Sequence, residues 1–340
     1  MITLTQTYFE EKVIQQTLDY NYAEYSDVDN FNIAYGIDKN FLFGCGVSIA
    51  SILIANPDTP FSFHVFTDSF SNDEQARFNA LAKQYATQIV VYLVDCEQLK
   101  LLPSTKNWSY ATYFRFIIAD HFAGKIDRVL YLDADIACQG SVQELIDLQF
   151  AEHEIAAVVA EGESEWWTKR SVSLAMPGLV SGYFNAGFLL INLPVWTAED
   201  ISRKAIEMLR DPDVVQRITH LDQDVLNMLL VGKARFIGKK FNTQFSINYE
   251  LKRDVVNPVD ENTVFIHYIG PTKPWHQWGN YPIAQSFLNA KKLSPWCNVE
   301  LLKPNNSHQL RYAAKHMFNQ KQYFSGLVDY ALYFKSKIIK

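Results

Sequence analysis

The chain has 340 residues, of which 48% are hydrophobic and 14% aromatic, and its formal net charge is −6. This composition excludes an intrinsically disordered protein, because it supplies enough apolar surface for a large core. The acidic balance argues against nucleic acid as a partner, because no overall basic field exists to neutralise phosphates. The length allows one large α/β domain or two smaller ones.

Cysteine usage and apolar runs indicate where the protein works. The cysteines are scattered without a Cys-x-x-Cys pair, which excludes a zinc ribbon and offers no disulfide framework: Cys45, Cys96, Cys138 and Cys297. Residues 1–6 contain no basic segment or apolar core of a signal peptide. The apolar run 41–55 is short for a membrane span and is interrupted by glycine and serine, so we expect a helix packed on a sheet. We therefore expect a cytoplasmic protein, soluble or peripheral on a membrane.

In chain order, the first predicted segment is an acidic N-terminal extension, residues 1–30, loosely structured or helical. Strands and helices then alternate. Apolar runs predict strands at 31–36, 61–66, 88–94, 129–132 and 155–160. Helical patterns lie between them, at 41–55, 72–85, 109–122 and 141–148. This alternation predicts a parallel, Rossmann-like sheet.

The pattern loosens after residue 160. The segment 161–182 contains Trp166 and Trp167 in a polar context, and we expect a loop or a lid there. Further strands are predicted at 184–192 and 265–268, and a helix at 222–230 with acidic residues in its first turn. In the last thirty residues six Lys or Arg face only Asp329, a net charge of +5 interleaved with aromatic residues. That segment fits an interfacial anchor on anionic lipid or, equally, a solvated C-terminal helix.

The central strand, residues 129–132, ends in a pair of carboxylates. Asp133 and Asp135 are separated only by Ala134, so an extended chain directs both side chains the same way and they repel each other. A hard divalent cation relieves such repulsion, and open α/β sheets bind ligands at the carboxyl ends of their strands. The pair therefore predicts a metal-dependent enzyme acting on a nucleotide diphosphate sugar. Two alternatives remain: solvated strand-end aspartates, and a phosphatase of the haloacid dehalogenase type.

A second motif, His267-x-x-Gly270-x-x-Lys273, follows a predicted strand. Gly270 permits close backbone approach to a phosphate, and Lys273 supplies a point charge for it. His267 adds a nitrogen ligand to two carboxylates, a mixed set that suits Mn²⁺ better than Mg²⁺. A lone histidine at a strand end is more often structural, so the indication comes from the combination.

Taken together, the motifs resemble those of glycosyltransferase family 8, whose members are retaining, UDP-sugar-dependent enzymes of the GT-A fold. The resemblance covers roughly residues 31–300, and its motifs appear in this order: Ala34-Tyr35-Gly36-x-Asp38-x-Asn40, Arg115, Asp133-Ala134-Asp135, Phe184-Asn185-Ala186-Gly187, Asp222-Gln223-Asp224 and His267-x-x-Gly270-x-x-Lys273-Pro274-Trp275. It implies an α/β protein with a single Rossmann-like GT-A domain at 31–300, built on a mixed central sheet. A helical, basic extension at 301–340 would associate with the membrane.

Within the family, the sequence is most similar to enzymes that build the lipopolysaccharide outer core of enteric bacteria. This resemblance implies transfer of galactose, or alternatively glucose, from a UDP-sugar to the lipopolysaccharide core in α-1,3 linkage. It also implies a peripheral location on the cytoplasmic face of the inner membrane. The two hexoses differ in one hydroxyl orientation, and both remain open.

The resemblance also implies a role for each motif residue. Mn²⁺ or Mg²⁺ would be bound by Asp133, Asp135 and His267. The diphosphate would meet Gly270 and Lys273, and the uridine would meet Asp38 and Asn40. The transferred hexose would be surrounded by Arg115, Asn185, Asp222, Gln223 and Glu161, with Ala134 and Ala186 as further substrate-binding positions. Gln223 would stabilise a cationic sugar during front-face attack, whereas Asp222 is the acidic candidate for a covalent route.

Rival functions make different demands on the sequence. A sugar nucleotidyltransferase needs a glycine-rich pyrophosphate loop after the first strand, and Gly36-Ile37-Asp38-Lys39 does not provide one. A non-catalytic glycan-binding module would lack at least one member of the metal and phosphate motifs, and all are present. A self-glucosylating primer protein remains possible within the family.

Overall fold

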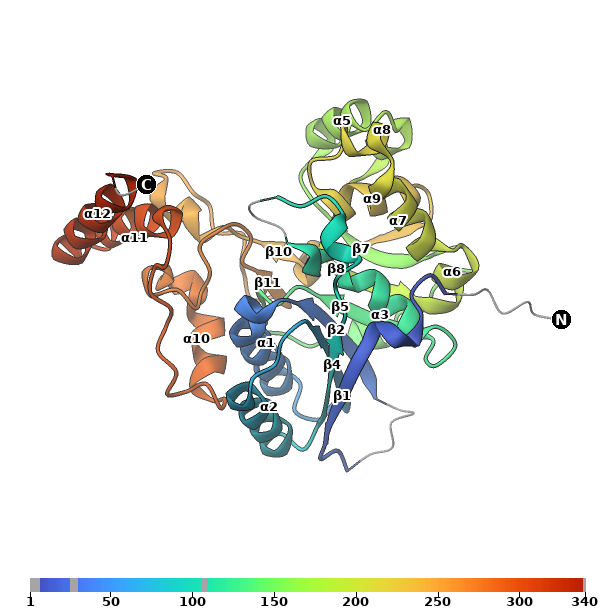
Figure 1. The fold of residues 1–340 in the computed structure, drawn as a ribbon, viewed down its shortest axis with the longest axis horizontal. Coiled ribbons are helices and arrows are strands. Elements are labelled where there is room, and N and C mark those ends of the chain that lie inside the picture. Colours follow the sequence, from blue (N-terminus) through green and yellow to red (C-terminus); the bar gives the residue numbers. More distant parts are fainter. Residues whose placement is uncertain (1–6, 25–29, 106–108, 339–340) are drawn as a thin grey trace. The chain divides into compact units, whose positions relative to one another are not determined.

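The computed structural model describes residues 7–24, 30–105 and 109–338 (Figure 1). The chain forms two compact units. The first unit comprises residues 1–42, 58–134 and 142–241, and the second comprises 43–57, 135–141 and 242–340.

The first unit is built on an eight-stranded mixed sheet in the order β1-β4-β3-β2-β5-β8-β7-β9. The strands are β1 (Ile14–Asn21), β2 (Phe31–Ile37), β3 (Phe61–Thr67), β4 (Gln88–Val94), β5 (Arg128–Leu132), β7 (Ala156–Ala160), β8 (Phe184–Asn192) and β9 (Ala234–Ile237). Strands β4, β3, β2 and β5 are parallel, as their apolar runs predict. Strand β8 runs antiparallel to both β5 and β7, which makes the sheet mixed.

Helices cover this sheet. A single apolar core joins one sheet face to α3 (Phe114–Phe122), α6 (Leu193–Ala198), α7 (Ile201–Arg210) and α9 (Leu221–Leu229). Helix α2 (Asn72–Gln84) packs on β1 and β4, and Ser71 and Glu74 form a capping box at its start. The remaining helices are α4 (Gln143–Ile146), α5 (Ser164–Ser173) and α8 (Pro212–Val215).

Two sequence predictions are wrong in this unit. Residues 14–21, expected to be loosely structured or helical, form the edge strand β1, antiparallel to β4. Only Asp19 is acidic within that strand, and the alternation of half-buried Ile14, Leu18 and Tyr20 with exposed residues suits an edge strand. The segment 161–182, expected to be a loop or a lid, is not a loop, because it contains α5 and the 3-10 helix Pro177–Ser181. The buried side of α5 is polar, with Arg170 and Ser171, so its sequence lacks an apolar stripe.

The second unit has a three-stranded sheet in the order β10 (Thr243–Gln244), β11 (Phe265–His267) and β6 (Ile136–Cys138). It also contains α1 (Leu42–Ala55, of which residues 43–55 belong here), α10 (Gln285–Lys292), α11 (Ser307–Asn319) and α12 (Tyr323–Ile338). Gly46 of α1 is required, because a Cβ there would lie 2.1 Å from the Trp296 ring. The predicted helix over 41–55 is thus confirmed.

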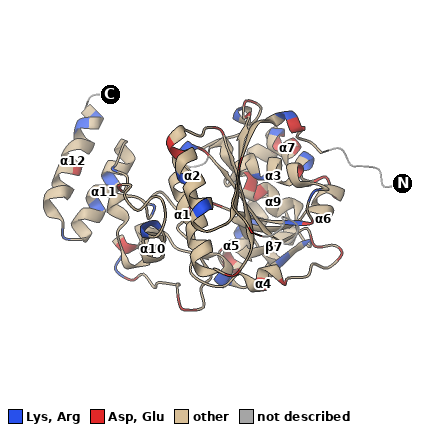
Figure 2. Ribbon diagram, turned by 90° about the horizontal axis from the view of Figure 1, so that it is seen from below, with Lys and Arg blue, Asp and Glu red and all other residues tan. Residues whose placement is uncertain are grey.

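Helices α11 and α12 lie side by side as a hairpin (Figure 1). They meet at Gly326, where an added Cβ would lie 2.8 Å from Phe318, so α12 approaches α11 closely at this point. Helix α11 contains Arg311 and Lys315, and α12 contains Lys335 and Lys337 in its last turn; Figure 2 marks Lys and Arg positions in blue. The helical, basic C-terminal part is therefore confirmed. Among the residues described, no helix is both long enough and apolar enough to cross a membrane.

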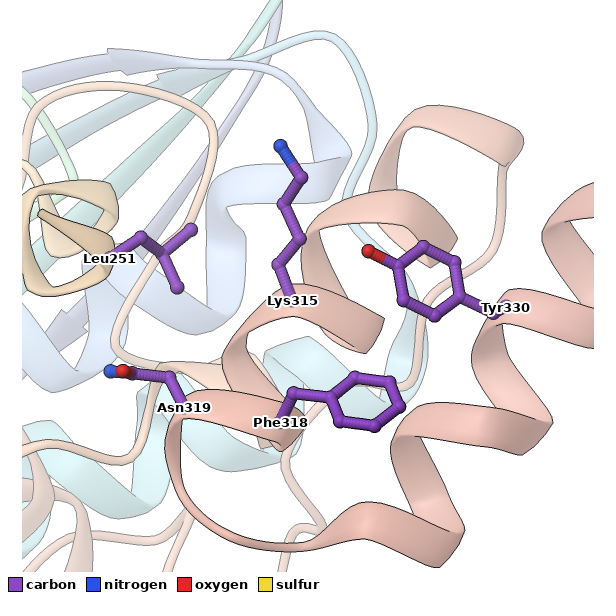
Figure 3. A pocket seen from close by; sticks show the side chains of 5 residues that line it. All are labelled: Leu251, Lys315, Phe318, Asn319 and Tyr330. Atoms are coloured by element: carbon purple, nitrogen blue, oxygen red, sulfur yellow. The ribbon is translucent and has the colours of Figure 1, made fainter.

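An open groove of about 620 Å³ lies beside this hairpin. It is lined by Leu251, Lys315, Phe318, Asn319 and Tyr330. Tyr330 directs its hydroxyl toward Lys315 across the groove (Figure 3). The groove thus combines an ammonium, an amide and a phenol with apolar walls.

Candidate active site

The two strand-end aspartates lie at a turn, with Asp133 just before it and Asp135 within it. Strand β5 is buried beyond Arg128 and ends at Leu132; the chain then turns at Ala134 and Asp135 and enters β6. The extended geometry considered for Ala134 is therefore not adopted. Asp135 begins the second unit, where its carbonyl accepts a 2.9 Å hydrogen bond from the Tyr268 N–H.

Arg115 is the centre of the charged cluster in the first unit. Its side chain is 3% exposed, with Nε 3.0 Å from the Asp222 carboxylate and Nη2 3.5 Å from the Asp133 carboxylate. The guanidinium lies over the Tyr131 ring at 4.4 Å, and Nη2 donates to the Tyr131 hydroxyl, which in turn donates to Asp133. Arg115 also donates from Nε to the Thr112 carbonyl and from Nη1 to the Ala186 carbonyl. This arginine is fully paired.

Burial dominates the electrostatics of this cluster. Burial raises the pKa of Asp222 to about 6, although Arg115 and the Thr112 hydroxyl stabilise its charged form. Burial alone would lower the pKa of Arg115, but Asp222, Tyr131 and Asp133 hold it above its usual value. Above pH 6 the cluster therefore contains an ionised Asp222 paired with a permanently charged arginine.

Gln223 follows Asp222 at the start of α9, and its amide is held from both ends. Its Nε2 donates to Glu161 at 2.9 Å, and its Oε1 accepts from the Ala186 N–H at 3.1 Å and from Asn185 Nδ2 at 3.2 Å. Asn185 Nδ2 also donates to Glu161 at 3.1 Å. The predicted residues Glu161, Asn185, Ala186 and Gln223 are thus brought together at the starts of β8 and α9 and the end of β7.

Asp224, the third residue of that motif, has a structural role. It is fully buried, accepts the backbone N–H groups of Thr219 and His220, and pairs with Arg170. Tyr183 donates to the same carboxylate and accepts from Gln223 Nε2. The network therefore orients Gln223 from within the core.

The predicted uridine residues lie where β2 ends. Asp38 accepts from the Asn40 N–H and from the Ser109 hydroxyl, both at 2.9 Å. At the end of the neighbouring β3, Asp68 accepts from the Tyr110 hydroxyl, and its buried Oδ1 has no hydrogen-bond partner. Acceptor oxygens thus follow two adjacent parallel strands, as expected of a ligand-binding sheet edge.

In the second unit Asp135 meets His267. His267 Nδ1 lies 2.9 Å from Asn242 Oδ1, which can only accept, so Nδ1 carries a proton. Nε2 faces Asp135 Oδ1 at 3.2 Å. A protonated ring donates from Nε2 to Asp135, and a neutral ring presents the Nε2 lone pair, which can bind a cation. Asp135 and His267 thus supply an oxygen and a nitrogen, the donor types of a divalent metal site.

Lys273 also converges on Asp135. Its ammonium pairs with the Asp135 carboxylate and donates to the Tyr268 carbonyl at 2.8 Å. Burial would raise the pKa of Asp135, but Lys273 and His267 hold it below its usual value. His276 holds the Lys273 backbone by two hydrogen bonds. Its ring Nδ1 accepts from the Lys273 backbone N–H at 3.1 Å, and its own backbone N–H donates to the Lys273 carbonyl at 3.0 Å.

Gly270 belongs to the same loop, and two structural features favour glycine at this position. Its φ is +84°, in the left-handed region, and an added Cβ would lie 2.9 Å from Ser246 Oγ. The loop that carries Lys273 is therefore shaped by a residue without a side chain.

Several supporting residues were not singled out from the sequence. Tyr131 fits the pattern of an apolar strand, so the sequence does not single out its hydrogen bond to Asp133. Asn242 lies 25 positions from its partner His267. Arg170 and Tyr183 pair with Asp224 over 54 and 41 positions. No local spacing signals such contacts, because the fold alone brings the partners together.

Comparisons with known proteins identify the family of this chain. Glycosyl transferase family 8 matches residues 32–279, and the family's C-terminal part matches residues 281–337. The chain therefore belongs to glycosyltransferase family 8, which confirms the family predicted from the motifs and its class, a hexosyltransferase.

Relatives with assigned names match almost end to end. The chain is 76% identical over 337 residues to the lipopolysaccharide 1,3-galactosyltransferase of Salmonella typhimurium, covering 99% of this chain and 100% of that protein. It is 52% identical over 337 residues to the lipopolysaccharide glucosyltransferase WaaO of Escherichia coli, covering 98% of this chain and 99% of the relative.

Solved structures confirm the GT-A fold. The galactosyltransferase LgtC, crystallised with donor and acceptor sugar analogues, superposes with a TM-score of 0.67 at 25% identity. The match covers 78% of this chain and 96% of LgtC. The glycosyltransferase GlyE of Streptococcus pneumoniae superposes with a TM-score of 0.56 at 20% identity, covering 79% of this chain and 62% of that chain.

Proposed function

We propose that this protein transfers galactose from UDP-galactose to the lipopolysaccharide core, in α-1,3 linkage and with retention at the anomeric carbon. The observation that carries the proposal is the convergence of two possible ligand atoms, Asp135 Oδ1 and His267 Nε2, beside the Lys273 ammonium. Such a cluster has the chemistry to hold a cation and the diphosphate it neutralises. The 76% identity with a lipopolysaccharide 1,3-galactosyltransferase supports the donor and the acceptor.

Mn²⁺ is the metal we propose, with Mg²⁺ as the alternative. The donor set fits, because Asn242 engages Nδ1 and orients the imidazole with Nε2, the other ring nitrogen, directed at a carboxylate oxygen. Asp135, His267 and Asp133 would hold the ion, and a mixed oxygen and nitrogen set suits Mn²⁺. When bound, the cation would supply Lewis-acid stabilisation of the diphosphate.

Protein groups in the second unit would stabilise the departing UDP. Lys273 places its ammonium by donating to the Tyr268 carbonyl, so its charge is fixed before the donor arrives. Gly270 would let the backbone approach a phosphate oxygen. Preorganised positive charge lowers the barrier, because negative charge builds on the leaving group as the glycosidic bond breaks.

In the first unit, Asp222 and Gln223 favour front-face attack over a covalent intermediate. Asp222 Oδ1 accepts from the Thr112 hydroxyl and Oδ2 lies 3.0 Å from Arg115 Nε, so this carboxylate is poorly available as a nucleophile. Gln223 Oε1 is oriented by two donors, the Ala186 N–H and Asn185, and would stabilise the cationic sugar. Arg115 and Glu161 would help to bind the hexose, and Asp38 and Asn40 the uridine.

The experiment that tests this function is hydrolysis of UDP-galactose and UDP-glucose, measured with Mn²⁺, with Mg²⁺ and with a chelator. We expect UDP-galactose to be preferred, Mn²⁺ to support the higher rate and the chelator to abolish hydrolysis. A preference for UDP-glucose would favour the second candidate, a glucosyltransferase, which the 52% identity with WaaO supports. Metal-independent hydrolysis would reject the proposed site.

Peripheral attachment to the cytoplasmic face of the inner membrane is part of the proposal. Phe324, Leu327, Phe334 and Ile338 of α12 are 81%, 61%, 60% and 81% exposed. Their spacings of 3, 7 and 4 residues place them on one helix face, because a helix turn has about 3.6 residues. An exposed aromatic face beside lysines suits an anionic lipid surface, which supplies both apolar depth and negative charge.

Vesicle flotation tests the attachment. We expect the protein to float with vesicles containing phosphatidylglycerol and to remain unbound with pure phosphatidylcholine. Replacing Phe324, Leu327 and Ile338 by serine should release it, whereas serine at Val172, a 77% exposed position of α5, should not. Equal flotation of the triple variant and the native protein would reject α12 as the anchor.

A further inference from the structure

A chain of buried hydrogen bonds connects α11 to the loop that carries Lys273. His316 of α11 is fully buried, and its Nε2 lies 2.9 Å from Asn248 Oδ1. The same oxygen accepts the Thr272 hydroxyl at 2.6 Å. Thr272, itself fully buried, directly precedes Lys273, so one amide oxygen links the helix to the loop.

The directions of these bonds are fixed by their chemistry. Asn248 Oδ1 only accepts, so His316 Nε2 is protonated and Nδ1 accepts from the Tyr281 hydroxyl at 2.9 Å. Burial, with a smaller effect from Lys315, lowers the pKa of His316 to about 4, which keeps the ring neutral near pH 7. The neutral ring therefore acts as one donor and one acceptor.

The loop itself has little freedom to compensate. Trp278 Nε1 donates to the Thr272 hydroxyl at 3.2 Å, and Trp278 packs with Ala313 and Met317 of α11. An added Cβ at Gly279 would lie 2.4 Å from the Lys273 carbonyl. Removing one buried bond therefore leaves polar groups unpaired next to the lysine backbone.

We propose that His316 and Asn248 are positioning residues for the donor diphosphate, acting through Thr272 on the loop of Gly270 and Lys273. The inference rests on the proposed function, which assigns the diphosphate to that loop. Helix α11 then has two faces with separate tasks. Its buried face holds the loop of Gly270 and Lys273, which we call the donor loop. On its other face Lys315, Phe318 and Asn319 line the open groove (Figure 3).

Calorimetric titration of the full chain with UDP and with UMP, both in Mn²⁺, tests this proposal. UMP lacks the β-phosphate, so the ratio of the two affinities reports on the part of the site that binds the diphosphate. We expect His316→Ala to weaken UDP binding about tenfold and UMP binding by less than about twofold. His316→Gln, which keeps a donor for Asn248, should restore UDP affinity to within about threefold of the native value.

The matched control is His308→Ala, on the same helix, where the exposed ring contacts Tyr312. It should leave both affinities unchanged. Should His316→Ala fail to fold, Tyr281→Phe removes only the hydroxyl that donates to Nδ1, and we expect UDP binding to weaken about threefold. Equal weakening of UDP and UMP, or none, in the folded variant would overturn the positioning role. Absence of UDP binding by the native protein would instead overturn the proposed function.

Discussion

In the first unit Arg115 meets two carboxylates, Asp133 and Asp222, whereas in the second unit one carboxylate, Asp135, meets His267 and Lys273. Arg115 is paired with carboxylates, two carbonyls and a hydroxyl, so the buried guanidinium is held from several sides by the protein itself. In the other cluster a carboxylate oxygen and an imidazole nitrogen, two atom types that bind divalent metals, lie 3.2 Å apart. We propose that a cation binds to both of them.

The contrast separates two uses of buried charge. A buried arginine that neutralises carboxylates fixes the shape of a binding surface, and its removal damages folding first. Side chains that would bind a metal ion serve the reaction, and their removal damages function first. Substitutions in the two clusters should therefore split between stability and activity.

The largest effect should come from His267→Gln, which we expect to lower kcat/KM about a thousandfold by removing the nitrogen ligand. Stability should change little, because the substitution leaves an amide of similar size. Asn242→Ala should weaken Mn²⁺ binding by about 10- to 100-fold, since Asn242 would act on the metal by orienting the His267 ring. A coupled assay of UDP release measures both, with Asp58→Asn at an exposed turn as the control. Native-like turnover of His267→Gln would contradict the assignment.

In the other cluster we expect the free energy of unfolding to fall by about 3–5 kcal/mol in Arg115→Ala, because two carboxylates lose their buried partner. The control Arg203→Ala breaks an ion pair with Asp200 whose side chains are 38% and 39% exposed, and should change stability by at most about 1 kcal/mol. Urea denaturation compares the two. Similar losses in both variants would show that the Arg115 cluster is not special.

The pH dependence of stability sharpens the same comparison. The folded pKa of Asp222 is raised from 3.8 to about 6, so folding favours its protonated form. This contribution is complete below pH 3.8 and is lost as the pH rises through 6. Between pH 4 and 7 the native protein should therefore lose about 2 kcal/mol relative to Asp222→Asn. Urea denaturation at both pH values measures the difference; a native protein that gains stability relative to the variant would contradict the raised pKa.

How much the sequence predicts depends on how local the signal is. The strand before Asp133, the glycine of the donor loop and the residues of the family motifs are recognisable, because each depends on neighbours a few positions away. Strand β1 was missed because an edge strand exposes half of its residues. The support of His267 by Asn242 and of the donor loop by His316 was missed because these contacts span 25 and 68 positions, the latter through Asn248. Such partners are chosen by packing, which leaves no periodicity in the sequence.

The smallest expected effect concerns the donor loop backbone. The control is Gly124→Ala, which lies outside this loop. It should reduce stability by about 1 kcal/mol, because the φ of Gly124 is +71° but the space around it is open. Gly270→Ala, with φ +84° and a contact of 2.9 Å to Ser246, should lose about 1 kcal/mol more and also weaken UDP binding. Thermal unfolding and UDP titration of both variants measure the difference. Equal behaviour would mean that Ser246 moves aside freely.

The most direct test of the metal site is electron spin echo spectroscopy of Mn²⁺ bound to the protein with UDP. The account predicts a nitrogen coupling from a directly bound imidazole in the native protein, and its loss in His267→Gln. It also predicts that the coupling persists in His308→Ala, whose ring is exposed on α11. A native spectrum without imidazole nitrogen, from a protein that still hydrolyses UDP-galactose in Mn²⁺, would contradict the central claim.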